Sequence, residues 1–524
     1  MRRSAPRAES LLAAAAALVG CIGIVSALTP EFANRYDLVR GVLPPGVPHA
    51  ARIFALAFGI ALIWLSRSLG RRRRRAWLLA VLLVFGSAVA HLAKGLDVEE
   101  AASAVVLLIA LIRYRSRFDV PGDPEAVRPL LLVALAAAAI GAVALGIELR
   151  GAELPDRLAD AFEGVGLVLG LAALGLWLRP LSHAVAQTVV ERRAVRELVD
   201  AYGTDSLAFF ALRRDKSYHF SPSNRAFLAY RVVAGAALIS GDPVGDANEF
   251  DALLADFERF AHRHGWRLAV VGALAENLPY YERLGMRAIA IGDEAVLVPA
   301  EFSLEGRAIR KVRQSVSRLT KAGYRFRVVA VEELDEELRA ELDAVSAAWR
   351  GRNVERGFSM SMDDLYAPGT TFALAQAEDG AIGGFLHLAP VPADAGWSLS
   401  TMRRRPDSPN GLTEFLVVET LAWAKALGAP EVSLNFCALT DFVAPERAVT
   451  VPRRLVRRAL LAADSVFQLE RLHSFNRKFH PHWRPRYLCV ERLSDLPLVG
   501  LAYLHVEQLL VPPGPWARRE RVSH

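Results

Sequence analysis

Residues 303–323 read SLEGRAIRKVRQSVSRLTKAG, and this stretch separates two regions of similar pattern. At about 100° per residue, its cations gather on one helical face and its apolar residues on the opposite face. Ser303 can accept backbone N–H bonds at the start, and Gly323 suits the left-handed position that ends a helix. The polar face holds Arg307, Arg310, Lys311, Gln314, Arg318 and Lys321. Because Glu305 is the only acid in the stretch, we predict a basic helix that binds an anion such as a phosphate; a solvated surface helix is the alternative.

The first 180 residues carry much of the apolar character of the chain. A membrane-spanning helix needs about 17 to 25 residues, and six apolar runs come close to or meet this requirement. They lie at about 10–28, 50–66, 76–93, 98–112, 129–147 and 161–178. Few ionisable residues fall inside these runs, which favours an anchor or a lipid-presenting platform over a transporter.

Arginine-rich and charge-poor loops alternate between these runs. Arg71–Arg75 follow the second run, and further arginines flank the loop after the fourth: Arg113, Arg115, Arg117 and Arg128. The loops after the third and fifth runs carry only Lys94, and then Arg150 and Arg157. The positive-inside rule therefore predicts a multi-pass protein of the cell membrane with both termini in the cytoplasm.

Size and overall charge leave many functions open. A chain of 524 residues has room for two to four domains, and a net charge of +7 leans towards acidic partners such as nucleic acid or anionic lipid. The cysteines, Cys21, Cys437 and Cys489, are odd in number and far apart, so no disulfide framework is predicted.

Two regions of similar element order flank the basic helix. The first shows short strands over 206–240, a helix over 247–264, a strand over 267–271, a short helix ending at 280–286 and a strand over 287–298. The second shows a strand over 324–331, a helix over 335–349, a hairpin turning at 379–380, a strand over 397–402, a helix over 412–427 and a strand over 431–437. The stretch YERLGM at 281–286 resembles the late helix-to-strand corner of GCN5-related N-acetyltransferases (GNAT proteins).

The predicted fold class is therefore an α-helical membrane domain with about six transmembrane helices, followed by tandem α/β GNAT-like domains joined by a basic helix. The expected boundaries are 1–180 for the membrane domain, 195–300 for the first GNAT-like domain, 301–323 for the linker helix, 324–500 for the second GNAT-like domain with the active site, and 501–524 for a tail.

The segment between a strand and a helix that follows Met402 contains the largest group of residues suited to bind a substrate. Three arginines, Arg403–Arg405, directly precede a loop and a helix start, and free N–H groups beside arginines favour an anion. The loop has one glycine and two prolines, unlike the glycine-rich loop that cradles coenzyme A in acetyltransferases, so coenzyme A is not expected. Glu414 follows on the helix, and Ser433, Asn435 and Cys437 share one face of the next strand by alternation.

Several motifs, taken in order, resemble the cytoplasmic synthase region of the bacterial aminoacyl-phosphatidylglycerol synthases, the multiple peptide resistance factor (MprF) family. They are GDPVG at 241–245, FSL at 302–304, ERGFS at 355–359, MR at 402–403, LNF at 434–436 and FNRKFHPHW at 475–483, running on to Arg486-Tyr487. The resemblance covers about residues 200–495 and is closest to the type fused to a lysyl-tRNA synthetase, although no synthetase is expected after His524.

The resemblance implies transfer of lysine or alanine from aminoacyl-tRNA to the head group of phosphatidylglycerol, which lowers the negative charge of the membrane. The expected partners are aminoacyl-tRNA, phosphatidylglycerol or a related lipid, and the membrane; no cofactor, metal or DNA is expected. Ser400 stands where the family commonly has an aspartate, which leaves two alternatives open. These are a different lipid acceptor, such as diacylglycerol, and a non-catalytic protein that binds tRNA or lipid.

The resemblance also implies roles for particular residues. Arg403 is predicted to bind the lipid phosphate or the oxyanion, Lys478 to hold the tRNA terminus, and Glu414 to act as the base. The further substrate-binding candidates are Arg404, Asn410, Gly411, Asn435, Trp483 and Arg486. The tRNA- or anion-binding candidates are Arg307, Arg310, Lys311, Arg318 and Lys321. Structural alternatives are a salt bridge for Arg403, pairing of Glu414 with Lys425 or another cation, and a plain surface position for Lys478.

The remaining reactive side chains are interpreted as structural. His480 and His482 lack further ligands nearby, so no metal site is predicted. Cys437 is expected to be a small core residue rather than a nucleophile. His387 lies in an apolar hairpin strand and is expected to be a core histidine with its hydrogen bonds satisfied.

Overall fold

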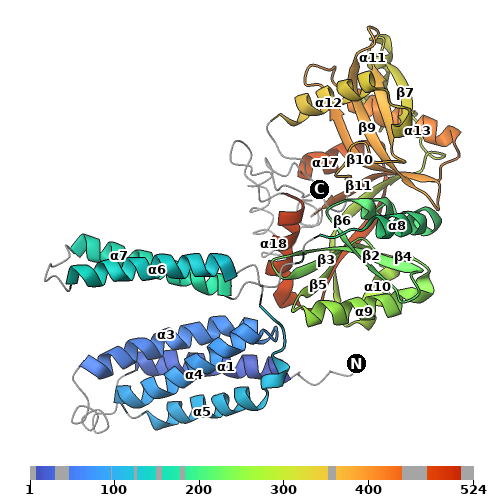
Figure 1. The fold of residues 1–524 in the computed structure, drawn as a ribbon. Helices are drawn as coiled ribbons and strands as arrows, with labels where there is room; N and C mark the ends of the chain where they lie inside the picture. Colours follow the sequence, from blue (N-terminus) through green and yellow to red (C-terminus); the bar gives the residue numbers. More distant parts are fainter. Residues whose placement is uncertain are drawn as a thin grey trace. The chain divides into compact units, whose positions relative to one another are not determined.

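The computed structural model describes residues 8–29, 46–95, 97–122, 127–148, 156–177, 183, 185–351, 361–438 and 469–508. The chain divides into a helical unit within the first 182 residues and, residues 260–266 apart, an α/β unit from His183 onward (Figure 1). The two units are described separately below.

The helical unit contains one helix at each of the six predicted runs. These are α1 (Ala8–Leu28), α3 (Gly46–Leu69), α4 (Arg74–Gly95), α5 (Val98–Arg113), α6 (Val127–Glu148) and α7 (Asp156–Trp177). Helices α1 and α3 approach closely because Gly20 and Gly59 face each other; a Cβ on Gly20 would lie 2.6 Å from the Gly59 carbonyl oxygen. Small residues permit such contacts between membrane helices.

Two of these helices are long and apolar enough to cross a bilayer, namely Ala8–Leu28 and Arg74–Ala93, among the residues that the structure describes. Large apolar side chains such as Leu82, Phe85 and Val106 are exposed on the helical unit. An exposed apolar surface of this kind suits lipid better than water. Membrane association is therefore plausible, while the arrangement of six spans stays a prediction.

The α/β unit is built on one mixed sheet of twelve strands. The strands are β1 (Ser217–Phe220), β2 (Ala226–Val233), β3 (Ala236–Ser240), β4 (Val244–Gly245), β5 (Arg267–Leu274), β6 (Arg287–Leu297), β7 (Arg325–Ala330), β8 (Thr371–Gln376), β9 (Ile382–Val391), β10 (Gly396–Arg404), β11 (Val432–Ala438) and β12 (His482–Val490). Their order is β1-β2-β3-β5-β12-β6-β11-β10-β9-β8-β7, with β4 paired to β2. In each half an antiparallel meander leads through a helix to a parallel strand, so that β3 pairs with β5 through α9 (Phe250–Arg263) and β10 pairs with β11 through α13 (Leu412–Ala426).

The two halves exchange a strand at the centre of the sheet, a feature that the sequence did not predict. Strand β12, from the second half, pairs with β5 and β6 of the first half; Leu488 lies opposite Val271 on one side and Ile289 on the other. Strand β6, from the first half, pairs in turn with β11 of the second. Residues expected in separate domains, 195–300 and 324–500, therefore share one continuous sheet.

Helices cover both faces of the second half of this sheet (Figure 1). Helix α12 (Glu336–Arg350) packs on the face that carries Leu374 and Phe385. Arg403 lies opposite Phe385 across the β9–β10 pair and so belongs to this α12 face. Helix α13 packs on the other face, against Leu386 and Leu388. This division separates the candidate site residues into two groups.

Among the residues that the structure describes, the first half and the later part of the chain also contain α8 (Val189–Tyr202), α10 (Leu278–Arg283), α17 (Leu469–Asn476) and α18 (Leu496–Val506). Helix α8 begins with a capping box, in which the Thr188 hydroxyl accepts from the Glu191 N–H and the Glu191 carboxylate accepts from the Thr188 N–H.

The basic helix, α11, is shorter than predicted and spans Arg310–Lys321. Gly306 has φ +89°, a left-handed conformation that a right-handed helix cannot continue through. Ser303 therefore caps only a local turn, accepting from the Glu305 N–H at 3.1 Å, and Arg307 precedes the helix. The apolar face is confirmed, because Ile309, at the N-cap, and Val312 and Leu319 are buried. Gly323 follows the helix with φ +80°, as predicted.

Candidate functional site

Each half of the sheet has a cavity at the carboxyl end of its first parallel strand. In the first half the cavity lies at the end of β3 and below the segment that follows α8; in the second it lies at the end of β10 and below α12. Crevices outside the carboxyl ends of parallel strands are the usual binding places in open α/β sheets. The two cavities thus occupy equivalent positions in the two halves but differ in charge.

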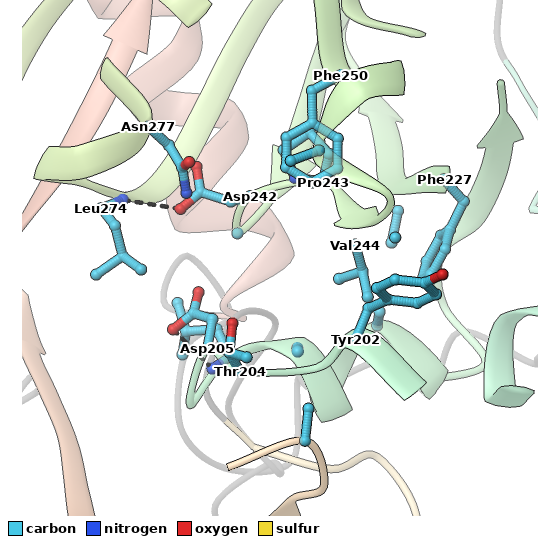
Figure 2. A pocket seen from close by; sticks show the side chains of 18 of the residues that line it. Tyr202, Thr204, Asp205, Phe227, Asp242, Pro243, Val244, Phe250, Leu274 and Asn277 are labelled. Carbon is cyan, nitrogen blue, oxygen red and sulfur yellow. Dashed lines mark hydrogen bonds between the residues drawn. The ribbon is translucent and has the colours of Figure 1, made fainter. Parts of the chain in front are cut away.

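The pocket of the first half is about 380 Å³ in volume and is lined by the GDPVG segment, residues 241–245 (Figure 2). A Cβ on Gly245 would lie 2.3 Å from the Arg225 carbonyl oxygen, so only glycine fits there. Asp242 accepts hydrogen bonds from the Leu274 N–H (2.9 Å) and the Tyr281 hydroxyl (2.5 Å). Burial, followed by the charge of Asp205, raises the pKa of Asp242 to about 6.

The charged side chains that line this pocket are all acidic. They are Asp205, Asp242, Asp246 and Glu276. Such a pocket favours a cationic group over an anionic one. No site residue was predicted here, although the glycine–proline turn at 241–245 was a usable signal, because turns of this kind bring the backbone close to a ligand.

The cavity of the second half is about 410 Å³ in volume and contains Arg403. Helix α12 contributes one face, the segment 361–365 a second wall, and β10 a third. The lining residues are Asp343, Ser346, Ala347, Arg350, Ser361, Met362, Asp363, Leu365, Thr401 and Arg403. Arg403 is 6% exposed, and its guanidinium carbon lies 6.0 Å from the centre of the Trp349 ring. A largely buried guanidinium that lines a cavity is suited to hold an anion.

Ser400 connects this wall to the strand. Its hydroxyl accepts a hydrogen bond from the Met362 N–H at 3.0 Å, which ties the segment 361–365 to β10. The residue that replaces the aspartate of the family motif therefore still accepts a hydrogen bond from the cavity wall.

Glu414 and Lys478, two of the three predicted catalytic residues, pair with each other at 2.7 Å. Lys478 is about half exposed and lies 5.1 Å from the Phe475 ring, whereas Lys425 donates to the Ala300 carbonyl instead. Glu414 belongs to α13, on the sheet face opposite α12. The structure therefore brings Glu414 and Lys478 together but places Arg403 on the other face.

The start of α13 is covered rather than open. Gly411 has φ +95°, and a Cβ there would lie 2.6 Å from the Ser315 Cβ of α11. Arg318, also of α11, donates a hydrogen bond to the Asn410 carbonyl oxygen. Of the neighbouring arginines, Arg404 donates to the Ser408 carbonyl at 3.2 Å. The expected anion site at this helix start is thus closed by α11.

The cations of α11 differ in their surroundings. Arg310, Lys311 and Lys321 are exposed, and no described residue pairs with them in an ion pair. Arg313 stabilises the segment that precedes the helix by donating hydrogen bonds to the Leu304 and Gly306 carbonyl oxygens. Three of the five predicted tRNA-binding cations therefore form an open cationic surface, whereas Arg307 precedes the helix and Arg318 binds Asn410.

Asn435 and Trp483 are engaged within the protein. Asn435 has φ +67°, donates to the Leu399 carbonyl at 3.0 Å, and accepts from the Phe436 N–H. It therefore stabilises the irregularity in the pairing of β11 with β6 between Ser433 and Phe436. The Trp483 ring stacks on His473 at 4.8 Å.

Arg486 is completely buried and binds carboxylates of the first half. Its guanidinium donates to Glu294 at 2.6 Å and to Asp205 at 2.5 Å. Burial alone would lower the pKa of Arg486, but the charges of Asp205 and Glu294 raise it above its ordinary value. The predicted substrate-binding arginine thus ties β12 into the first half.

His387 is buried, as predicted, but its hydrogen bonds are not satisfied. Neither ring nitrogen has a partner among the residues that the structure describes. The ring lies 4.9 Å from that of Phe372. Burial, followed by the charge of Arg403, lowers the pKa of His387 to about 3, so the imidazole is neutral. The ERGFS motif at 355–359 and the side chain of Cys437 lie outside the described residues.

The interlocked halves, each with a cavity at the end of its parallel strand, define a tandem GNAT-like fold. A family model described as "Phosphatidylglycerol lysyltransferase, C-terminal" matches residues 196–490, and the chain belongs to this family. The family predicted from the motifs is confirmed.

Curated LysX proteins resemble the chain over most of its length. The bifunctional lysylphosphatidylglycerol biosynthesis protein LysX of Rhodococcus jostii RHA1 is 34% identical over 516 residues, which cover 90% of this chain and 46% of that protein. LysX of Mycobacterium tuberculosis H37Rv is 34% identical over 90% of this chain and 44% of its own length. The chain thus spans less than half of these curated relatives.

Among solved structures, L-PGS from Bacillus licheniformis has a TM-score of 0.54 at 23% identity and covers 61% of this chain and 97% of its own. The C-terminal domain of a putative lysylphosphatidylglycerol synthetase from Agrobacterium fabrum has a TM-score of 0.51 at 24% identity, over 61% of this chain and 98% of its own. At these identities the likeness establishes the fold.

Proposed function

We propose that this chain transfers a lysyl group from lysyl-tRNA to the glycerol head group of phosphatidylglycerol at a membrane surface. The observation that carries the proposal is the position of Arg403 in a cavity within residues 196–490, the region that matches the phosphatidylglycerol lysyltransferase family. A membrane-associated helical unit suits a lipid acceptor, and the open cations of α11 suit a tRNA.

The reaction is an ester exchange. A hydroxyl of the lipid glycerol attacks the aminoacyl carbonyl carbon, the bond to the tRNA ribose breaks, and the released ribose hydroxyl takes up the proton. No electron acceptor or activated coenzyme is required, because the aminoacyl ester is already activated. Arg403 is assigned to the negative charge of the lipid phosphate or of the developing oxyanion. Lys478, paired with Glu414, is assigned to the tRNA on the opposite face of the sheet, and Glu414 is given no role at the carbonyl beside Arg403 because the sheet separates them.

The pocket of the first half favours lysine over alanine as the transferred amino acid. Its charged lining is entirely acidic; Asp205 and Asp246 are paired with Arg486 and Arg225, whereas Asp242, whose raised pKa is about 6, is mostly ionised at neutral pH. A lysyl ammonium group would gain from this charge, whereas an alanyl methyl group would not. The choice between amino acids that the sequence left open is therefore proposed as lysine.

The decisive experiment is the transfer of labelled lysine from charged tRNA into extractable lipid by membranes that carry the protein. Arg403→Ala is expected to reduce the rate by about 10²- to 10³-fold, the usual loss for one charge-stabilising donor. Arg403→Lys should recover little, because an ammonium cannot reproduce the two-pronged grip of a guanidinium. Arg327→Ala, at an exposed position on β7, is the matched control and should leave the rate unchanged.

The same assay decides between the remaining readings. Lysyl-tRNA should be used in preference to alanyl-tRNA, and the product should carry a phosphatidylglycerol head group. A labelled diacylglycerol ester would mean that diacylglycerol, and not phosphatidylglycerol, accepts the lysine. The absence of any labelled lipid would favour a non-catalytic protein that binds tRNA or lipid. Near-normal transfer by Arg403→Ala would remove Arg403 from the mechanism.

A further inference from the structure

The cavity beneath α12 contains a polar group to which the proposed reaction assigns no role. Ser346 is 5% exposed and lines the cavity. Its hydroxyl has no hydrogen-bond partner among the residues that the structure describes. Because an unsatisfied buried hydroxyl lowers stability, most such groups in proteins have a partner. A hydroxyl in this state beside a cavity therefore indicates a ligand that completes its hydrogen bond.

The cavity lining combines two guanidinium groups with two carboxylates that accept hydrogen bonds from neighbouring residues. Helix α12 presents Asp343, Ser346, Ala347 and Arg350 to the cavity, at the i, i+3, i+4, i+7 spacing of a single helical face. Asp343 already accepts from the Tyr366 hydroxyl at 2.8 Å, and Asp363 accepts from the Arg214 N–H at 2.9 Å. Arg350, Arg403 and Ser346 line the same cavity. Guanidinium groups match the paired oxygens of a phosphate, and a hydroxyl donor adds a third contact.

The positions of the cations suggest different binding places for the two anionic substrates, the tRNA and the lipid head group. The open cations of α11 (Arg310, Lys311 and Lys321) belong to the helix that packs on α13, on the face opposite α12. A tRNA bound there leaves the α12 cavity for the second anion. The volume of about 410 Å³ falls within the about 300 to 1,000 Å³ typical of small-ligand sites.

We infer that the cavity beneath α12 binds the glycerophosphodiester head group of the lipid acceptor, and that the Ser346 hydroxyl donates to a non-bridging phosphate oxygen. Arg350 and Arg403 provide the charge, and Ser346 selects the position of the phosphate. This inference rests on the proposed function for the identity of the lipid. Ser346 is a binding residue here and takes no part in bond making.

The test is equilibrium binding of radiolabelled glycerophosphoglycerol, the deacylated head group, to the full chain in detergent micelles. Ser346→Ala should weaken binding about tenfold. The matched control is Ser398→Ala: Ser398 is also completely buried with a hydroxyl that lacks a partner among the described residues, but it does not line the cavity. This control should bind as the wild type does. Ala347→Leu narrows the cavity from an exposed helix position and should abolish binding, which keeps the test valid if Ser346→Ala is unstable.

Competition identifies the source of the phosphate. Phosphatidylglycerol vesicles should displace the label, inorganic phosphate should do so only at much higher concentration, and uncharged tRNA should not. Wild-type binding by Ser346→Ala or by Ala347→Leu overturns the inference, as does displacement by tRNA but not by the lipid. Head-group binding by a chain that transfers no lysine would overturn the proposed function alone. Normal transfer with an unchanged KM of Ser346→Ala for phosphatidylglycerol would overturn the head-group site alone.

Discussion

Lys216, directly before β1, is completely buried in the first half. Its ammonium group donates to the Phe210 carbonyl and to the Ser240 hydroxyl, both at 2.8 Å. Burial, followed by the charge of Arg213, lowers the pKa of Lys216 to about 7. A lysine in an unfolded chain titrates near 10.4. Between these values the unfolded chain holds a proton that the folded chain has released.

Stability should therefore depend on pH through this lysine. The free energy of unfolding should rise with pH from about 7 to about 10.4, by up to about 1.4 kcal/mol per pH unit, and this contribution should stay constant below pH 7. Lys216→Met keeps the shape and removes the titration. Chemical denaturation of both proteins in the same detergent gives the difference at each pH. A difference that does not change between pH 7 and pH 10 would contradict the lowered pKa.

At the scale of single residues, the sequence identified candidate functional side chains but not the residues that they contact in the fold. Arg403 and Lys478 were found from motifs, and both lie where a charge can reach a substrate. Arg486 was predicted to bind substrate but is buried, because its partners Glu294 and Asp205 lie 192 and 281 residues away in the chain. Local patterns carry no information on contacts at such separations. Ser346 was missed for the same reason, since the cavity exists only when α12 packs on β10.

At the scale of elements, the basic helix leads to a prediction about tRNA. Reversing its exposed cations with Arg310→Glu, Lys311→Glu and Lys321→Glu should weaken tRNA binding and reduce its dependence on salt, because each lost phosphate contact lowers the salt slope by about 0.7 to 0.9. Binding measured over a range of salt concentrations gives both quantities. Arg325→Glu with Arg327→Glu, at exposed positions on the edge strand β7, is compared with the double variant Arg310→Glu and Lys311→Glu as the charge-matched control. Equal losses in both variants would mean a general charge effect instead of a binding surface.

Element order was predictable because periodicity is local. The predicted helices and strands of both halves appear in the expected order, and the hairpin turn at Gly380, with φ +92°, lies where predicted, whereas α17, β12 and α18 were not predicted. The start of α11 was placed too early because the helical pattern of charges continues through Gly306, whose left-handed backbone no pattern of polarity reveals. Strand pairing was not predictable either, since alternation shows which face of a strand is buried but not which strand lies beside it.

At the scale of the whole molecule, the arginine-rich loops predict topology. Reporter fusions after Arg75 and after Pro180 should both report the cytoplasmic side, because positive loops are retained there. Fusions after Lys94 and after Arg150 should report the opposite side and act as controls. An external result after Pro180 would separate the α/β unit from cytoplasmic tRNA and would contradict the proposed function.

The exchange of β6 and β12 has a consequence for how the protein is made. About 185 residues separate the end of β6 from the start of β12. At a synthesis rate of about 5 to 20 residues per second, a ribosome needs roughly 10 to 40 s to cover that distance. Throughout this interval the first half has emerged with the gap between β5 and β6 unfilled and with Asp205 and Glu294 lacking Arg486. The nascent chain therefore passes through a stage in which the facing edges of β5 and β6 lack the strand that fills the gap between them in the folded sheet.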